Sequence, residues 1–582
     1  MQRKWITVVG LLTLMVIGSA LRLAEVTRKS ISHPEMYVPG IRLPDSLSEP
    51  RQRLTLKSVI TGTFSSDTHP PGYYVAMWFW TRCFGTSIWS LRVPSVLLGI
   101  GSIGLVFWLG VLIRHVSIGW LAAALLAFNG YAVFWTSVAR MFSLACFLGL
   151  LATLLLVFIA RQPRPSRVAC AAYVLTLLAG LTVHVFFWLV LATHVLWTLL
   201  NTFQQARASA VIKLQILVTI LGTPLLAFSA YQSANTVAVL SDAIGVYGRE
   251  FVGFSFLFPL SGFSFGVFLP EAPYPPADES HLSAFRIGFT ILCTVLLVLG
   301  IARLRRSSAE PVAFQGRGPS GRSYALATLL ATATILAFVL TAERFIEPQP
   351  TIRITRAMTV LPAAIAVIAV LLERLWRYLP RARVSAVVKA AVGGRGLVVM
   401  MAFVPLALLS ALSLVKPMLN GRGLLFVSPY LLLVLAAGIV WVWERARAAG
   451  VALLVFLAVT HAISIRRYSQ LAMDPADMKR FVAQLAPQVH HTDLLFLNPS
   501  WYATPVLYYL DEDRYHLVGR DYDVAAAGPD RRIWVLRFYD EAMPAAMQAA
   551  LQPYHQVGVT AIPHASATLY VRSPAAALGE RQ

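Results

Sequence analysis

The dominant pattern along the chain is a series of long apolar stretches separated by short polar loops. Each stretch has about the length needed to cross a hydrocarbon core of ~30 Å, and backbone amides in that medium must be satisfied within their own segment, which favours helices. The pattern is weakest at 185–200 and at the break near His184. We therefore predict about thirteen membrane-spanning helices, at 5–21, 91–113, 117–134, 141–160, 168–183, 185–200, 212–229, 286–303, 324–341, 357–372, 397–415, 424–442 and 451–465.

Composition supports a membrane protein and argues against a soluble one. Hydrophobic residues make up 57% of the chain and charged residues 13%, about half of the roughly 25% typical of globular proteins. The net charge of +22 comes mostly from Arg in short loops, where it acts as a topology signal, whereas a nucleic-acid-binding protein gathers basic residues on one soluble face. We expect no nucleic-acid partner. The cysteines lie in apolar stretches without CxxC spacing and are interpreted as reduced packing residues: Cys83, Cys146, Cys170 and Cys293.

The basic loops also predict an orientation. If the N-terminus is cytoplasmic, the loops expected inside carry clusters such as those at 161–167, 303–322 and 374–395, in accordance with the positive-inside rule. An odd number of spans places the C-terminal tail outside. We predict a multi-pass protein of the cell (plasma or inner) membrane, with a cytoplasmic N-terminus and an extracytoplasmic C-terminal domain.

The chain divides into a transmembrane domain at 1–465, which includes long outside loops at 22–90 and 230–285, and a more polar tail at 466–582. In the first loop, aromatic residues at 73–84 after two prolines predict an interfacial helix. In the tail, Asp474 and Pro475 are expected to begin a helix that runs to about Leu485. Strands at 494–497, 532–537 and 568–571, with helices at 501–510 and 541–552, predict a small α/β domain.

Four short motifs occur in order along the predicted outer face. They are His33-Pro34-Glu35-Met36-Tyr37, then Asp67-Thr68-His69-Pro70-Pro71-Gly72-Tyr73-Tyr74, then Leu91-Arg92-Val93-Pro94-Ser95, and finally Ala139-Arg140-Met141-Phe142. Together they resemble the GT-C superfamily of membrane glycosyltransferases, in particular the branch of protein O-mannosyltransferases and lipid A aminoarabinose transferases. Thr182-Val183-His184 and 422–429 look like later elements of the same family. The predicted fold is thus an all-α, GT-C-like polytopic membrane protein with a small C-terminal α/β domain.

The resemblance implies an inverting transfer of a sugar from a polyprenyl-phosphate-linked donor to an acceptor. The partners it implies are this donor, membrane lipids and an acceptor of unknown class, which is a lipid, a polysaccharide or a protein. No cofactor is assigned with certainty, and a divalent metal ion is an open alternative. The reaction needs a carboxylate to take the proton of the acceptor hydroxyl and cations to stabilise the departing phosphate.

The acids of the first outside loop are the catalytic candidates. Glu35 occupies the second position of the family's Asp-Glu pair and is our candidate general base, although Pro34 stands where the Asp would be. Asp67 is a second candidate, and its alternative role is a helix N-cap. His69 and Tyr73 of the following motif are assigned to substrate binding. For Glu35 the alternative is a loop glutamate paired with a nearby Arg.

Arginines near the predicted outer ends of the spans are the candidate ligands of the donor phosphate. Arg140 lies in an apolar stretch, where an ion is costly and suggests a function. Val138 replaces the acid that the family has just before this motif. Arg356 and Arg422 begin similar segments that both lead to a Pro, and either is suited to a bidentate phosphate contact. The alternatives are snorkelling or headgroup contact.

Two other functions are compatible with the same sequence. A transporter or flippase of lipid-linked sugars would share a basic region open to lipid, and it would show interrupted spans in matching halves. A non-catalytic GT-C relative would explain the two missing acids, at Pro34 and Val138. Sugar transfer remains the principal hypothesis because the acid and Arg candidates fall at one predicted membrane face.

Overall fold

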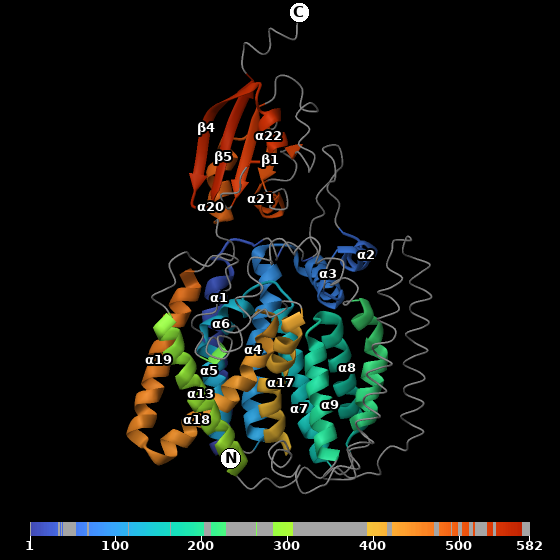
Figure 1. The fold of residues 1–582 in the computed structure, drawn as a ribbon, viewed down its shortest axis with the longest axis vertical. Helices are drawn as coiled ribbons and strands as arrows, with labels where there is room; N and C mark the ends of the chain where they lie inside the picture. The colour runs from blue at the N-terminus through green and yellow to red at the C-terminus, as the bar shows by residue number, and fades with distance from the viewer. Residues whose placement is uncertain are drawn as a thin grey trace, which may run out of the picture. The chain divides into compact units, whose positions relative to one another are not determined.

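A computed structural model describes the chain at residues 2–32, 35, 38, 54–66, 69–113, 116–162, 165–202, 211–228, 263–264, 283–306, 393–415, 422–470, 477–490, 492–498, 503–510, 516–517, 532–538 and 543–572. Long helices dominate this part of the chain, and a small sheet lies near its C-terminal end (Figure 1). Within the described residues, seven helices are long and apolar enough to cross a membrane, or eight if one bent pair is counted as a span. The chain is therefore a multi-pass membrane protein.

The described helices coincide with the predicted apolar stretches, with one exception at 117–134. The predicted spans at 324–341 and 357–372 lie outside the described residues. The helices of the bundle are α1 (Gln2–Val26), α4 (Ile88–Leu112), α5 (Val116–Phe128), α6 (Gly130–Thr136), α7 (Phe142–Arg161), α8 (Arg167–Val183), α9 (Phe187–Thr202), a helix over Val211–Phe228, α13 (Ser283–Arg306), α17 (Gly393–Val415), the 3-10 helix η3 (Arg422–Val427), α18 (Ser428–Arg445) and α19 (Arg447–Gln470).

The single span predicted at 117–134 is in fact broken, because α5 and α6 meet at an angle of 63°. Asn129 lies at the break in an extended conformation, and its side chain accepts a hydrogen bond from the amide of Ala132 at the start of α6. The last carbonyls of α5 lose their helical partners there. Arg22 of α1 replaces them, because its fully buried guanidinium donates to the carbonyls of Leu126 and Ala127.

α18 lies at the centre of the bundle and is enclosed along most of its length. It packs closely on α13 at two glycines: a Cβ at Gly300 would lie 2.0 Å from the carbonyl oxygen of Val434, and one at Gly438 would lie 2.1 Å from that of Leu296. Small residues at such crossings let helix backbones approach in a membrane. Arg303 and Glu444 form an ion pair between the same two helices.

A chain of polar side chains links several helices inside the apolar bundle. Thr153 Oγ1 of α7 lies 2.7 Å from the hydroxyl of Tyr430 and 3.0 Å from Nε2 of His194 on α9. The Tyr173 hydroxyl of α8 lies 3.1 Å from the other ring nitrogen of His194, and Gln215 donates to that hydroxyl. His194 is thus a buried histidine whose two ring nitrogens both have partners.

We expect His194→Phe to lower stability by about 1–3 kcal/mol, since hydrogen bonds between membrane helices contribute roughly 0.6–1.7 kcal/mol each and two are lost. Thermal unfolding of the full chain in detergent measures the change. The matched control is Thr193→Val, because Thr193 is equally buried and its hydroxyl bonds the carbonyl of Leu189 in its own helix. Equal stability of the His194 variant and the wild type would show that the network contributes nothing.

Two short helices precede α4. They are α2 (Leu56–Ser66) and α3 (Gly72–Phe84), the second of which the aromatic pattern predicted. On α3, Tyr74 and Met77 are buried, whereas Phe79 and Phe84 are more than half exposed. Arg82 stacks on the ring of Trp78, 4.1 Å from its centroid. Exposed aromatic rings beside a cationic group are typical of a helix at the membrane interface.

The C-terminal residues form a five-stranded mixed sheet of order β2-β1-β3-β5-β4. Its strands are β1 (Leu494–Asn498), β2 (His516–Leu517), β3 (Ile533–Phe538), β4 (Tyr554–Ile562) and β5 (Ala565–Arg572). β2, β1 and β3 are parallel, and β5 is antiparallel to both β3 and β4. The sequence predicted β1, β3 and β5 but not β2 or β4.

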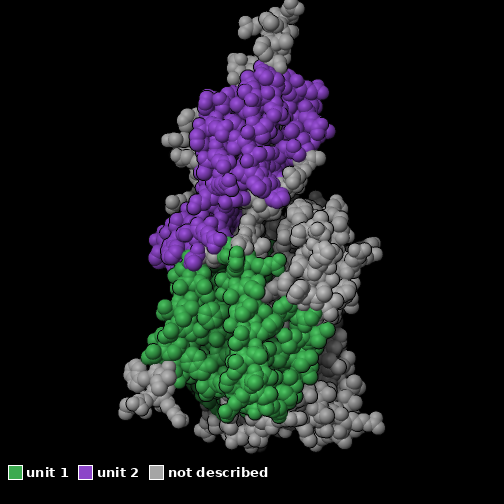
Figure 2. Space-filling view, turned by 90° about the vertical axis from the view of Figure 1, so that its left-hand side faces the viewer, with its two compact units in different colours: residues 1–23, 60–73, 94–469 green, residues 24–59, 74–93, 470–582 purple. Residues whose placement is uncertain are grey.

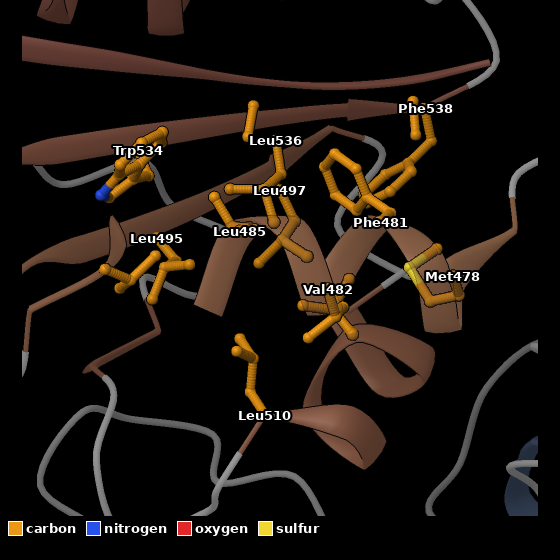
Figure 3. Packing of buried hydrophobic residues seen from close by; sticks show 14 residues of the cluster. Met478, Phe481, Val482, Leu485, Leu495, Leu497, Leu510, Trp534, Leu536 and Phe538 are labelled. Carbon is orange, nitrogen blue, oxygen red and sulfur yellow. The ribbon is translucent and has the colours of Figure 1, made fainter. Parts of the chain in front are cut away.

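Helices cover both faces of the sheet. α20 (Met478–Leu485) and α21 (Ala503–Tyr509) pack with Leu495, Leu497 and Trp534 in the core that Figure 3 shows, and α22 (Ala545–Ala550) packs on the opposite face. The N-cap of α20 is Asp477, whose side chain accepts from the amide of Arg480. Asp474 and Pro475, where the sequence predicted the start of this helix, lie outside the described residues, and the described helix begins at Met478 with Asp477 as its cap.

The contacts divide the chain into two compact units (Figure 2). Unit 1 comprises residues 1–23, 60–73 and 94–469 and contains most of the membrane helices. Unit 2 comprises residues 24–59, 74–93 and 470–582, so the C-terminal domain forms one unit with much of the first loop and with the start of α4. The predicted boundary between 465 and 466 stays a prediction.

Candidate functional site

Arg140 lies in the turn that joins α6 to α7 in unit 1. α6 ends at Thr136, where the Ser137 hydroxyl and amide both donate to the carbonyl of Phe134. The neighbours Val138 and Ala139 are buried, and Arg140 itself is only partly buried. The turn therefore holds a guanidinium at the end of two apolar helices.

Arg422 is the first residue of η3, the 3-10 turn that leads into α18. The residues after it, from Gly423 to Val427, are buried, whereas Arg422 is exposed. η3 packs against α6 and α7, the two helices that flank the Arg140 turn. The buried turn thus fixes the start of α18 beside the segment that carries Arg140.

His69 lies just before α3, whose first residue, Gly72, packs directly on the end of α8. A Cβ at Gly72 would lie 2.4 Å from Thr182 Oγ1 and 2.6 Å from the Thr182 carbonyl oxygen, so only glycine fits here. The close approach brings the ring of His69 to 4.9 Å from that of His184, measured between centroids. The two sequence motifs that carry these histidines therefore meet.

His184 connects this contact to η3. It is the C-cap of α8 and has an extended backbone, which explains the weak helical pattern near it in the sequence. Its Nδ1 accepts a hydrogen bond from the amide of Phe186, and a Cβ at Gly423 would lie 2.8 Å from the Phe186 ring and 3.5 Å from Cε1 of His184. Four segments far apart in the sequence thus converge, and we call His69, Arg140, His184 and Arg422 the basic cluster.

The charges of the basic cluster act on one another. Burial, followed by the positive charges of Arg140 and Arg422, lowers the pKa of His69 from its usual 6.5 to about 3. His69 is therefore neutral at physiological pH, while the guanidinium groups keep their charge. Two cations held near the neutral imidazole of His69 form an arrangement suited to an anion with several oxygens, such as a phosphate.

We expect acid to destabilise the protein through His69. Because the pKa is lower in the folded state, the unfolded chain binds the extra proton first, so this contribution to stability is complete above pH 6.5 and falls as the pH drops toward 3. His69→Gln removes this dependence, and the loss of wild-type stability between pH 7.5 and 5.5 should exceed that of the variant by about 1 kcal/mol. Thermal unfolding at both pH values measures the difference, and equal slopes would contradict it.

The basic cluster does not fit a divalent cation. Its two imidazoles lie beside two guanidinium groups, and the described residues hold no group of three or more His, Cys, Asp or Glu side chains arranged for a metal.

Glu35 belongs to unit 2 and is fully buried. Arg92, itself 2% exposed, holds it in a bidentate ion pair, with Nε to Oε1 and Nη2 to Oε2 both at 2.7 Å. The amide and the hydroxyl of Ser32 donate to Oε2 at 3.0 and 3.1 Å. The Glu35 carboxylate thus holds the loop to the start of α4. This pairing is the alternative role that the sequence suggested for Glu35, a loop glutamate paired with a nearby Arg.

The remaining donors of Arg92 bind the loop backbone. Nη1 donates to the carbonyls of Val26 and Lys29, and Nη2 also donates to that of Ser30. A base role for Glu35 would require the acceptor hydroxyl to reach this enclosed carboxylate. The assignment of Glu35 as general base stays a prediction.

The remaining residues that the sequence assigned to the site are Tyr73, Asp67 and Arg356. Tyr73 is buried at the start of α3. Asp67 and Arg356 lie outside the described residues, so their roles stay predictions. Sequence reasoning gave no role to Arg22 or Arg92; each is an Arg within or next to an apolar span, and that costly placement was the available signal.

Comparisons with known proteins find structural similarities at low sequence identity. No family model and no curated protein matches the chain. Among solved structures, it is similar to the Archaeoglobus fulgidus oligosaccharyltransferase in complex with Zn and sulfate, at 10% identity and a TM-score of 0.42, covering 88% of this chain and 62% of that one. It is also similar to ArnT from Cupriavidus metallidurans bound to undecaprenyl phosphate, at 11% identity and a TM-score of 0.39, covering 96% and 97%.

A third similarity is to the archaeal oligosaccharyltransferase AglB from Archaeoglobus fulgidus in complex with an inhibitory peptide and a dolichol-phosphate. The identity is 9% and the TM-score 0.42, and the match covers 98% of this chain and 75% of that one. At such scores the function has to be argued from the residues of this chain.

Proposed function

We propose that the chain is a membrane glycosyltransferase that moves a sugar from a polyprenyl-phosphate-linked donor to an acceptor at the outer face of the membrane, with inversion. The observation that carries the proposal is the basic cluster, in which Arg140 and Arg422 both act electrostatically on His69. Two of the three Arg residues that the sequence assigned to the donor phosphate thus lie near enough to His69 for their charges to act on it.

The position of the basic cluster favours a phosphate attached to a lipid. Arg140, His184 and Arg422 lie next to the ends of apolar helices, and His69 precedes the interfacial helix α3. A water-soluble anion does not require a binding site at the membrane. A polyprenyl phosphate does, because its polyprenyl chain lies in the bilayer and its phosphate lies at the membrane surface. Arg is well suited to this contact, because its fork binds two phosphate oxygens at once.

The proposed reaction is a single displacement at the anomeric carbon of the sugar. The acceptor oxygen forms a bond to this carbon while the bond from the carbon to the phosphate oxygen breaks, and the phosphate leaves with the electron pair. A carboxylate takes the acceptor proton, and Glu35 and Asp67 are the candidates, the second being two positions before His69 in the sequence. Arg140 and Arg422 stabilise the charge that develops on the leaving phosphate.

A transfer assay in membranes tests the proposal. Membranes containing the full chain are incubated with a panel of radiolabelled polyprenyl-phosphate sugars, and release of free polyprenyl phosphate is measured together with the labelled product. We expect one donor to be consumed faster than in membranes without the protein. A second arm with chelator decides whether a divalent metal takes part. Consumption of no donor in the panel would overturn the transferase proposal.

One alternative has a specific observation in its favour. Because Arg92 and Ser32 occupy the oxygens of Glu35, the chain could bind a lipid-linked sugar without transferring it. That protein would bind the donor through the basic cluster and leave the bond between sugar and phosphate intact. The same assay separates the two functions, because only a transferase releases free polyprenyl phosphate.

A further inference from the structure

α21 of the C-terminal domain contacts the first outside loop through two adjacent tyrosines within unit 2. The hydroxyl of Tyr509 accepts a hydrogen bond of 2.7 Å from the amide of Ile31, and the hydroxyl of Tyr508 donates one of 3.0 Å to the carbonyl of Thr86. Ile31 precedes the Glu35 turn, and Thr86 lies between α3 and α4. The two tyrosines therefore bind both chain segments that approach Arg92.

A second contact lies at the start of α20. The hydroxyl of Ser30 donates to Oδ1 of Asp477 and accepts from the amide of Lys479 at 3.1 Å. The first amides of a helix have no partner within the helix, so Ser30 completes the cap that Asp477 begins. The loop and the C-terminal domain thus form hydrogen bonds with each other through polar groups that would otherwise lack these partners.

Both contacts lead directly to the ion pair of Glu35 and Arg92. Ser30 and Ser32, on either side of Ile31, are bonded to Arg92 and Glu35 respectively. The charges of Arg92 and Glu35 act on Tyr508 and Tyr509. The tyrosines, the loop and the ion pair form one connected network in unit 2.

We propose that Tyr508 and Tyr509 are positioning residues that hold loop residues 26–32, and with them the carboxylate of Glu35, in a fixed place. The C-terminal domain then acts on the first outside loop as a brace. The expected effect on transfer rests on the proposed function, because the position of Glu35 affects catalysis only if the chain transfers a sugar. Its effect on the loop itself is independent of any activity.

The chemistry of the two side chains suits this role. Burial, and then the neighbouring Tyr509, raise the pKa of Tyr508 to about 12, so Tyr508 keeps its proton and stays a donor at physiological pH. Ile31 is buried, and its amide would have no partner if the Tyr509 hydroxyl were removed. A buried amide without a partner is costly, so Tyr509→Phe should loosen the loop.

Hydrogen exchange of the full chain in nanodiscs tests the proposal. In Tyr509→Phe, peptides from 26–35 should exchange at least about tenfold faster, the effect of losing one buried hydrogen bond, while peptides from α7 and α18 keep their wild-type rates. Ser30→Ala is the second variant and should give the same local acceleration. Tyr570→Phe is the matched control, because the Tyr570 hydroxyl forms no side-chain hydrogen bond with the described part of the chain.

Two results would overturn the proposal. One is unchanged exchange at 26–35 in both variants, and the other is an equal acceleration in the loop and in α7 and α18, which indicates global destabilisation. Transfer kinetics provide a second readout: kcat should fall in Tyr509→Phe while KM for the donor stays within twofold. If the chain transfers no sugar at all, the exchange result still decides whether the brace exists.

Discussion

Glu35→Gln is expected to destabilise the protein by about 3–5 kcal/mol, because it leaves the guanidinium of Arg92 buried without its counter-charge. Both side chains are almost completely buried, and their two hydrogen bonds of 2.7 Å are bidentate. Arg92 also donates to three carbonyls of the loop, so its displacement would release the segment between α1 and Glu35. Thermal or denaturant unfolding of the purified full chain measures the loss.

A double-mutant cycle separates the ion pair from other effects. We expect Arg92→Gln to be similarly destabilising, and the double variant Glu35→Gln with Arg92→Gln to be more stable than the sum of the single changes predicts. A suitable control is Glu444→Gln, since Glu444 is 43% exposed in its ion pair with Arg303 and such pairs contribute little. If Glu35→Gln unfolds like the wild type, the ion pair does not hold the loop.

The cycle also bears on catalysis. Loss of transfer in Glu35→Gln alone would be ambiguous, because the loop is expected to loosen together with the loss of the carboxylate. The informative comparison is with Arg92→Gln, which loosens the loop but keeps Glu35. If Glu35 is the base, transfer per folded molecule should fall much further in Glu35→Gln than in Arg92→Gln. A folded Glu35→Gln protein with full transfer would exclude the base role.

Arg140→Ala and Arg422→Ala should each weaken binding of undecaprenyl phosphate by about 10- to 150-fold, which corresponds to the roughly 1.5–3 kcal/mol of a hydrogen bond to a charged group. The physical reason is the loss of one of two cations in the basic cluster. Binding is measured with the full chain in nanodiscs, by the fluorescence of a labelled lipid or by its competition with unlabelled undecaprenyl phosphate.

The matched control for these variants is Arg445→Ala. Arg445 ends α18, the helix that η3 and Arg422 precede, and it stacks on Trp441 at 3.8 Å from the ring centroid. It carries the same charge at the far end of the helix that Arg422 precedes, and it lies outside the basic cluster. If Arg445→Ala weakens binding as much as Arg422→Ala, the contact is general attraction to the membrane surface and not a site.

The sequence predicted the helices well, because a long apolar stretch in a membrane has few alternatives to a helix. It did not predict the break of α5 and α6, since Asn129 looks like an ordinary polar residue within an apolar run. The break depends on Arg22, which lies more than a hundred positions earlier and supplies hydrogen bonds to Leu126 and Ala127. Local periodicity contains no information about such a distant donor.

The candidate site was also predicted only in part: the sequence indicated individual residues but not which residues pair with one another. The motifs indicated which residues to consider, and the positive charges of Arg140 and Arg422 both act on His69. Their roles in substrate binding stay predictions. The pairing of Glu35 with Arg92 was not specified, because the two residues are far apart in sequence and many Arg residues were available as partners. The sequence does not indicate the proposed role of α21 for a related reason: aromatic residues such as those at 501–509 are typical of an α/β core.

A structure of the full chain with undecaprenyl phosphate bound tests the central claim most directly. Our account predicts that the phosphate lies within hydrogen-bond distance of the guanidinium groups of Arg140 and Arg422, beside the ring of His69. A phosphate bound away from these three side chains would contradict the account.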